Sequence, residues 1–233
     1  MTSNQAAEKI APYAFLGMTA VTGLVDAVSF LSLGRVFTAN MTGNVVLLGF
    51  ATARVPGLSV TLSLTALGSF LTGAVLGGRI MAPASGDSHI RFAAQAFLLE
   101  LVMLTAAALC GIGYKGEVTE PSVQQLTLIA LTALAMGTRN AAVRKLAIPD
   151  LTTTVLTLTL TGIAADSLLA SGNNPRLARR IGAVVAMFSG ATLGAVVIRY
   201  YSVAAALGLA AAISALCNAA WYRYRSLRTS DEL

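Results

Sequence analysis

The chain has 233 residues, of which 56% are hydrophobic and only 11% are charged. Soluble domains carry about 25% charged residues, so this composition, with a mean hydropathy of +0.74, indicates a membrane protein. The net charge is +6, but the basic residues lie at the ends of apolar segments. This pattern excludes nucleic acid as the partner and fits cytoplasmic loops beside anionic lipid headgroups.

Eight apolar segments follow one another along the chain, and a bilayer crossing needs about 20 such residues. The first segment is longer than the roughly 7–15 apolar residues of a cleaved signal, so we interpret it as a span. With eight segments both termini lie on one side, which a modest excess of basic residues identifies as the cytoplasm. The segments are 11–34, 36–53, 58–78, 92–114, 122–147, 151–170, 181–198 and 203–220.

Two of these segments are interrupted. Residues 36–53 begin as extended chain and then carry Asn40, Thr42 and Asn44, whereas 151–170 follows Pro149-Asp150 and is rich in threonine, including Thr157. Backbone that leaves a helix inside a membrane must be satisfied by protein or by a wet cavity, and such breaks mark binding sites in many transporters. We therefore predict an all-α polytopic transmembrane bundle of 6–8 segments, with six or seven crossings if the broken segments are re-entrant.

The threonines of the second broken segment have two interpretations. One hypothesis starts them as a short strand that pairs with residues 36–39. The alternative is that their hydroxyls bond back to carbonyls of the same helix.

The stretch 23–49 joins the end of the first segment to the first broken segment. It carries a motif made of Gly23, Asp26, Ala27, Phe37, Asn40, Met41, Thr42, Gly43 and Asn44. This motif resembles the signature of the YoaK-type family of uncharacterised bacterial multi-pass membrane proteins, and residues 149–157 resemble a second family segment. The resemblance implies a protein of the bacterial inner membrane and carries no reaction or substrate with it.

Two related halves, about 12–114 and 122–222, are predicted within a single domain of residues 1–233. Three matches occur in the same order in both halves, although chance similarity among apolar helices is the alternative. Four segments per half would make the repeats parallel, and three or five would invert them. The matches pair Gly23-x-x-Asp26-Ala27 with Gly137-x-x-Asn140-Ala141, Thr42 with Thr157, and the GxxxG motif Gly73/Gly77 with Gly190/Gly194.

Charged residues inside apolar segments raise the free energy of membrane insertion, and such residues usually have a functional role. Asp26 is a candidate proton or cation site, with a structural hydrogen bond as the alternative. Arg139 either binds an anionic group or reaches the interface, and we predict that inside the bundle it approaches Asp26 or Glu100. The Asn and Thr residues bind a solute or act as helix caps. The predicted substrate-binding residues are Asp26, Asn40, Thr42, Asn44, Arg139, Asn140 and Thr157.

Four glycines are assigned to helix packing, because GxxxG spacing allows close helix contact. These are Gly73, Gly77, Gly190 and Gly194. Whether they pack within the chain or form a homo-oligomer is left open. After the last segment, Trp221, Tyr222 and Tyr224 are predicted to form an aromatic anchor at the membrane interface.

Catalytic and metal-binding constellations are missing from the sequence. The single histidine, His89, lies in a polar loop, and Cys110 and Cys217 lie in apolar runs, where cysteine behaves as a small apolar residue. We expect no enzyme activity, no metal, no cofactor and no Walker-type ATP site. The leading hypothesis is a secondary transporter or permease for a small solute. The alternative is a non-transporting membrane scaffold or sensor.

Overall fold

The computed structural model describes residues 3–84, 88–116, 121–146, 156–174 and 176–230, with side chains from residue 13 to residue 226. Within these ranges the chain is helical and contains no strand, which confirms the predicted all-α class. A single 3-10 turn, η1, spans Leu168–Ala170. The helices are α1 Ser3–Ser32, α2 Met41–Thr52, α3 Val60–Ile80, α4 Ser88–Cys110, α5 Val123–Leu146, α6 Leu156–Ala165, α7 Leu177–Tyr200 and α8 Val203–Ser230.

Six of the described helices are long and apolar enough to cross a membrane: α1, α3, α4, α5, α7 and α8. Helix α2 has 12 residues, or about 18 Å at 1.5 Å per residue, which is short of the ~30 Å hydrocarbon core. Helix α6, with 10 residues, is shorter still. Within the described residues, neither broken segment contains a helix long enough to cross, which leaves six candidate crossings and agrees with the six-crossing alternative.

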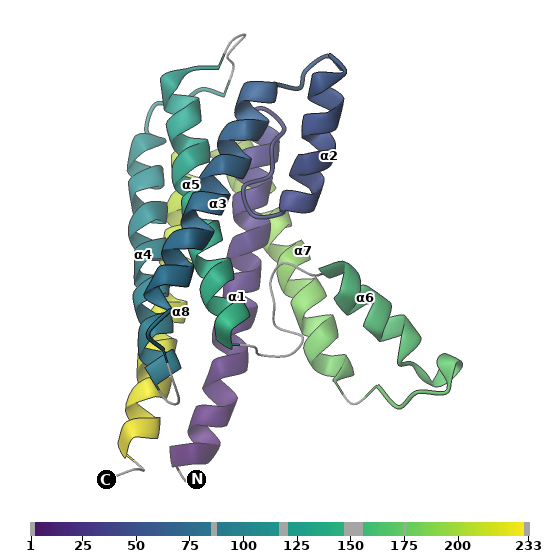
Figure 1. The fold of residues 1–233 in the computed structure, drawn as a ribbon, viewed down its shortest axis with the longest axis vertical. Coiled ribbons are helices and arrows are strands. Elements are labelled where there is room, and N and C mark those ends of the chain that lie inside the picture. Colours follow the sequence, from purple (N-terminus) through teal and green to yellow (C-terminus); the bar gives the residue numbers. More distant parts are fainter. Residues whose placement is uncertain (1–2, 85–87, 117–120, 147–155, 175, 231–233) are drawn as a thin grey trace.

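The six long helices alternate in direction between the two ends of the bundle (Figure 1). Helices α1, α4 and α7 run away from the end that holds both termini, and α3, α5 and α8 return to it. Helix α2 lies beside the upper part of the bundle and α6 beside the lower part. The loop at residues 33–40 turns back from the upper end before α2 rises again, which makes this segment re-entrant.

The turn after α1 depends on left-handed backbone. Gly34 has φ of 91° and Arg35 has φ of 57°. Helices commonly end on a residue in this conformation, and glycine adopts it without a steric penalty. This turn sends residues 36–40 back along α1 and brings them to the level of Asp26.

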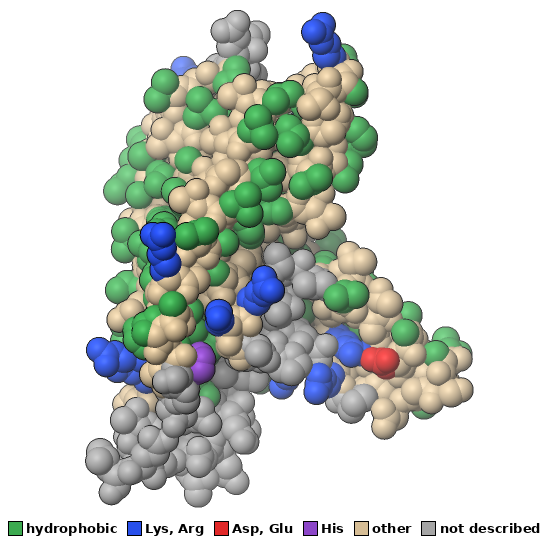
Figure 2. Space-filling model, viewed as in Figure 1, with side chains coloured by type: hydrophobic (Ala, Val, Ile, Leu, Met, Phe, Trp, Pro, Cys, Tyr) green, Lys and Arg blue, Asp and Glu red, His purple; other side chains and the backbone are tan. Residues whose placement is uncertain are grey.

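Helices of the first half of the sequence pack mainly on helices of the second half. Helix α1 packs against α7 and α8, α5 packs against α3 and α4, and α4 packs against α8. The short helices have one main neighbour each, α3 for α2 and α7 for α6. The outer surface of the bundle is apolar over most of its height, as expected for a surface in contact with lipid (Figure 2).

The four glycines assigned to helix packing make their contacts with other helices of the same chain. A Cβ at Gly73 or Gly77 of α3 would collide with the backbone of α5, at Leu134 or Thr138. A Cβ at Gly190 of α7 would collide with the backbone of Ala20 in α1, and Gly194 is packed nearly as tightly against α1. Each of these helix pairs also carries a glycine on the opposite side, Gly137 in α5 and Gly23 in α1.

The predicted aromatic anchor at the end of α8 needs a correction. Trp221 is only 2% exposed and packs edge-on against Phe15 and Phe97. Its indole N–H donates to the carbonyl of Ile90 at 3.1 Å. Helix α8 continues to Ser230, so Trp221 lies within the helical bundle and Tyr222, at 46% exposed, faces outwards.

Candidate functional site

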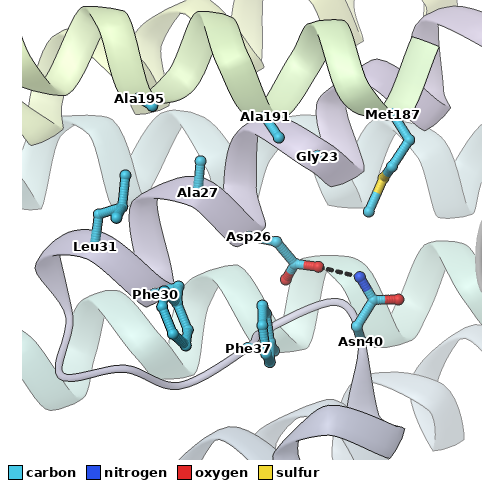
Figure 3. A pocket seen from close by; sticks show the side chains of 10 residues that line it. All are labelled: Gly23, Asp26, Ala27, Phe30, Leu31, Phe37, Asn40, Met187, Ala191 and Ala195. Atoms are coloured by element: carbon cyan, nitrogen blue, oxygen red, sulfur yellow. Dashed lines mark hydrogen bonds between the residues drawn. The ribbon is translucent and has the colours of Figure 1, made fainter. Parts of the chain in front are cut away.

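Asp26, six residues before the end of α1, anchors the re-entrant loop to that helix. Its side chain is 5% exposed. One carboxylate oxygen accepts the backbone N–H groups of Thr38 at 3.2 Å and Ala39 at 2.9 Å, and the other accepts from the amide of Asn40 (Figure 3). The carboxylate thus satisfies loop backbone that has left the helix at membrane depth, as the bilayer requires.

Asn44 fixes the start of α2 from the other side. It is 1% exposed, and its side-chain oxygen accepts the N–H of Phe37 at 3.4 Å. Its amide donates to the carbonyl of Ser63 in α3, also at 3.4 Å. Asn40 occupies the N-cap position of α2 without a side-chain capping bond, and its amide nitrogen donates to Asp26. Asn44 therefore holds the loop and α3 together, while Thr42 is exposed.

A groove of about 310 Å³ opens beside this loop, between α1 and α7. We call it the Asp26 groove. Its only polar side chains belong to Asp26 and Asn40, and the rings of Phe30 and Phe37 stack at 5.1 Å between centroids. The lining residues are Gly23, Asp26, Ala27, Phe30, Leu31, Phe37, Asn40, Met187, Ala191 and Ala195 (Figure 3). Of the predicted binding residues, Asp26 and Asn40 meet here, and Thr42 and Asn44 lie outside.

Arg139 lies elsewhere, in the interior of the bundle. Its side chain is fully buried and forms an ion pair with the fully buried Glu100 of α4 at 2.9 Å. It also donates to the carbonyl of Met18 at 3.1 Å and to the hydroxyl of Thr22 at 2.5 Å, both in α1. The prediction that Arg139 finds an intramembrane acid is confirmed, with Glu100 as the partner. The interfacial alternative is wrong, because the guanidinium does not reach the surface.

The remaining predicted residues are separate from the groove. Asn140 follows Arg139 in α5, and Thr157 is exposed on α6. The carbonyl of Thr157 accepts the hydroxyl of Thr161 at 2.9 Å, which is the back-bonding arrangement. The proposed break at Pro149-Asp150 and the strand-forming threonines 152–154 lie outside the described residues, and residues 36–39 form no strand.

A polar cluster on α8 was missed at the sequence level. Ser214 and Asn218 are buried beside α4, and the Asn218 amide donates to the carbonyl of Phe97 at 3.2 Å. Within the described residues, four side-chain atoms of this region have no hydrogen-bond partner: Glu100 Oε2, Arg139 Nε, Ser214 Oγ and Asn218 Oδ1. The available signal was a hydroxyl and an amide four residues apart, on one helix face of an apolar run. The described residues contain no group of three or more potential metal ligands.

Comparison with known proteins identifies a family but finds no similar protein of solved structure. A family model described as a protein of unknown function, DUF1275, matches residues 14–220. The chain is also similar to the UPF0700 transmembrane protein YoaK of Bacillus subtilis (strain 168), with 38% identity over 144 residues. That match spans 62% of this chain and 61% of the relative. No solved structure matches. With six apolar helices long enough to span a bilayer, the chain belongs to the DUF1275 family and is a multi-pass membrane protein.

Proposed function

We propose that the protein is a secondary transporter or permease for a small solute, and that the Asp26 groove is its solute site. The observation that carries this proposal is a buried carboxylate within a span, beside a re-entrant loop and an open groove. Broken segments that surround a polar group near the midplane are typical of transporter sites. The groove volume also falls within the roughly 300–1,000 Å³ of small-ligand pockets.

We also propose that the halves are an inverted duplication. If α1 corresponds to α5 and α3 to α7, the α1–α7 pair is equivalent to the α5–α3 pair. Likewise, α1–α8 is equivalent to α5–α4, and α2–α3 to α6–α7. Matched glycines support this, because Gly23 approaches the backbone of α7 as Gly137 approaches that of α3. Three crossings per half require opposite orientations, the arrangement in which one repeat rocks against the other.

The groove lies between these proposed repeats. Asp26 and the loop belong to the first half, whereas Met187, Ala191 and Ala195 belong to the second. A movement of α7 relative to α1 would therefore widen or close the site. This is how a fixed carboxylate could face each side of the membrane in turn.

The end of the bundle that holds the termini is proposed to face the cytoplasm of a bacterial inner membrane. Cytoplasmic loops carry an excess of Lys and Arg. With six crossings, nine described basic residues lie at that end: Arg79, Arg91, Arg144, Lys145, Arg176, Arg179, Arg180, Arg223 and Arg225. Four lie at the other end: Arg35, Arg54, Lys115 and Arg199. Figure 2 shows more of the visible Lys and Arg side chains over the lower half.

A non-transporting scaffold or sensor is the second candidate. It is favoured by the centre of the bundle, where the Arg139–Glu100 pair and apolar side chains are packed together. The four packing glycines are used within the chain, so a homo-oligomer would form through another surface. We propose no enzymatic activity.

The test of transport is a counterflow assay in proteoliposomes, with solutes chosen by a thermal-shift screen of the purified protein. Transport predicts that a stabilising solute exchanges across the membrane and that Ala195→Leu, which fills the groove, slows the exchange. The matched control is Ala212→Leu, which adds the same side chain at an exposed position of α8. If solutes bind to the protein but none of them exchanges across the membrane, the sensor function is favoured.

A further inference from the structure

We propose that the Asp26 groove binds an organic cation with an apolar body, such as a protonated or quaternary amine that carries an aromatic or alkyl group. This inference names the solute class for the proposed transporter. The binding step can be tested independently of transport. It rests on three features of the groove, which are its charge, its aromatic wall and its otherwise apolar lining.

The charge of the groove is negative and not neutralised by another side chain. Asp26 is its only ionisable lining residue, and it forms no ion pair with any described residue. The fully buried Arg139 forms its ion pair with Glu100 and does not line the groove. A carboxylate offers about four acceptor positions, and three donors occupy them here, two on one oxygen and one on the other. One acceptor position remains, on the oxygen bonded to Asn40.

The aromatic wall favours a cation over a neutral solute of the same shape. Phe30 and Phe37 stack with an interplanar angle of 20°. The face of an aromatic ring attracts cations, by about 0.5–2 kcal/mol depending on desolvation. The thioether of Met187, which also lines the groove, is polarizable and adapts to ligands of irregular shape.

The rest of the lining selects against small inorganic ions. A hard cation such as Ca²⁺ takes about 6–8 oxygen ligands, whereas this groove offers one carboxylate and one amide among apolar side chains. A hydrated anion would meet the Asp26 carboxylate with no basic side chain in the lining. An organic cation instead contributes apolar surface of its own, which the alanines, Leu31 and the phenylalanines can cover.

The experiment uses three probes of similar shape with the purified full-length protein. Benzyltrimethylammonium has a permanent positive charge, neopentylbenzene is its uncharged carbon isostere, and benzylsulfonate is an anion. Calorimetric titration should show saturable binding of the cation, with the isostere and the anion at least about tenfold weaker, or 1.4 kcal/mol. Equal binding of the isostere, preferential binding of the anion, or no saturable binding of the cation would overturn the proposal.

Variants test whether this binding occurs in the groove. Ala195→Leu should weaken cation binding at least about tenfold, and Phe30→Leu severalfold, whereas Ala212→Leu should leave it unchanged. Asp26→Asn should abolish the preference for the cation over its isostere. Since this variant could also release the loop, Ala195→Leu provides the independent check. Unchanged cation binding in Ala195→Leu would overturn the assignment to the groove.

The outcomes for solute class and for transport can be separated. Saturable cation binding without counterflow would refute transport and keep the binding site. Counterflow of another solute, with no cation binding, would keep transport and refute the cation class.

Discussion

Neutralising Glu100 should cost far more stability than neutralising both members of its ion pair. Glu100→Gln leaves the guanidinium of Arg139 buried, with no anion to balance it. Breaking a buried pair in this way costs about 3–5 kcal/mol. Arg139 keeps its bonds to Met18 and Thr22, and a glutamine oxygen can still accept, so we expect the lower part of that range. The double variant with Arg139→Gln leaves no buried charge and should recover most of the loss.

Thermal unfolding in detergent, followed by tryptophan fluorescence, measures this difference. Trp221 is the only tryptophan and is buried against Phe97, one turn from Glu100. At about 2–4 °C per kcal/mol for a chain of this size, the Tm of Glu100→Gln should fall by roughly 6–12 °C. The control is Asp166→Asn, because the Asp166 side chain is 50% exposed and Arg180 keeps its bonds to Gly162 and Asn174, so the change should cost less than about 1 kcal/mol. Equal losses in the single and double variants would refute the reasoning.

Three further predictions concern the glycine contacts, the loop and the orientation. Gly73→Ala should lower the Tm because its Cβ collides with α5 backbone, whereas Gly68→Ala, in open space on the same helix, should be neutral or gain up to about 1 kcal/mol; equal effects would contradict the close contact. Asn44→Ala should cost about 1–3 kcal/mol, because two buried bonds are lost, and should expose the loop to limited proteolysis. An unchanged digestion pattern would show that Asn44 does not hold the loop. In a cysteine-free background, a membrane-impermeant maleimide added to intact spheroplasts should label Arg54→Cys and spare Ser226→Cys, and the reverse would invert the proposed orientation.

The spans could be predicted because their cause is local. A long apolar helix satisfies its own backbone in lipid, so length and composition placed all six long helices among the eight predicted segments. The pairing of Arg139 with an acid was also predictable, because a buried charge without a partner destabilises the fold. Close packing at Gly73 follows from a spacing that can be seen in the sequence.

The shape of the site could not be predicted, because it depends on distant contacts. Residues 36–53 are apolar enough to span, but the chain turns back at Gly34 and Arg35, and Asp26 holds the returning loop by accepting bonds from residues 38–40. The second wall of the groove comes from Ala191 and Ala195 of α7, which resemble any small residues of a span. The seven predicted binding residues were grouped by chemical type, and tertiary packing placed them in different environments.

The packing of α1 has a consequence for how the protein is made. Helix α1 packs mainly against α7 and α8, which are synthesised last, and its ring contact with the first half is the edge-on packing of Phe15 on Phe97 of α4. Helix α1, which contains Asp26, therefore enters the membrane first and lacks its two main neighbours until almost the whole chain has been inserted. Final assembly is then a late step inside the bilayer, when α7 docks through the paired glycines Gly23 and Gly190. A ribosome-stalled chain that ends before α7 should accordingly hold α1 in place only loosely, however complete its first three crossings are.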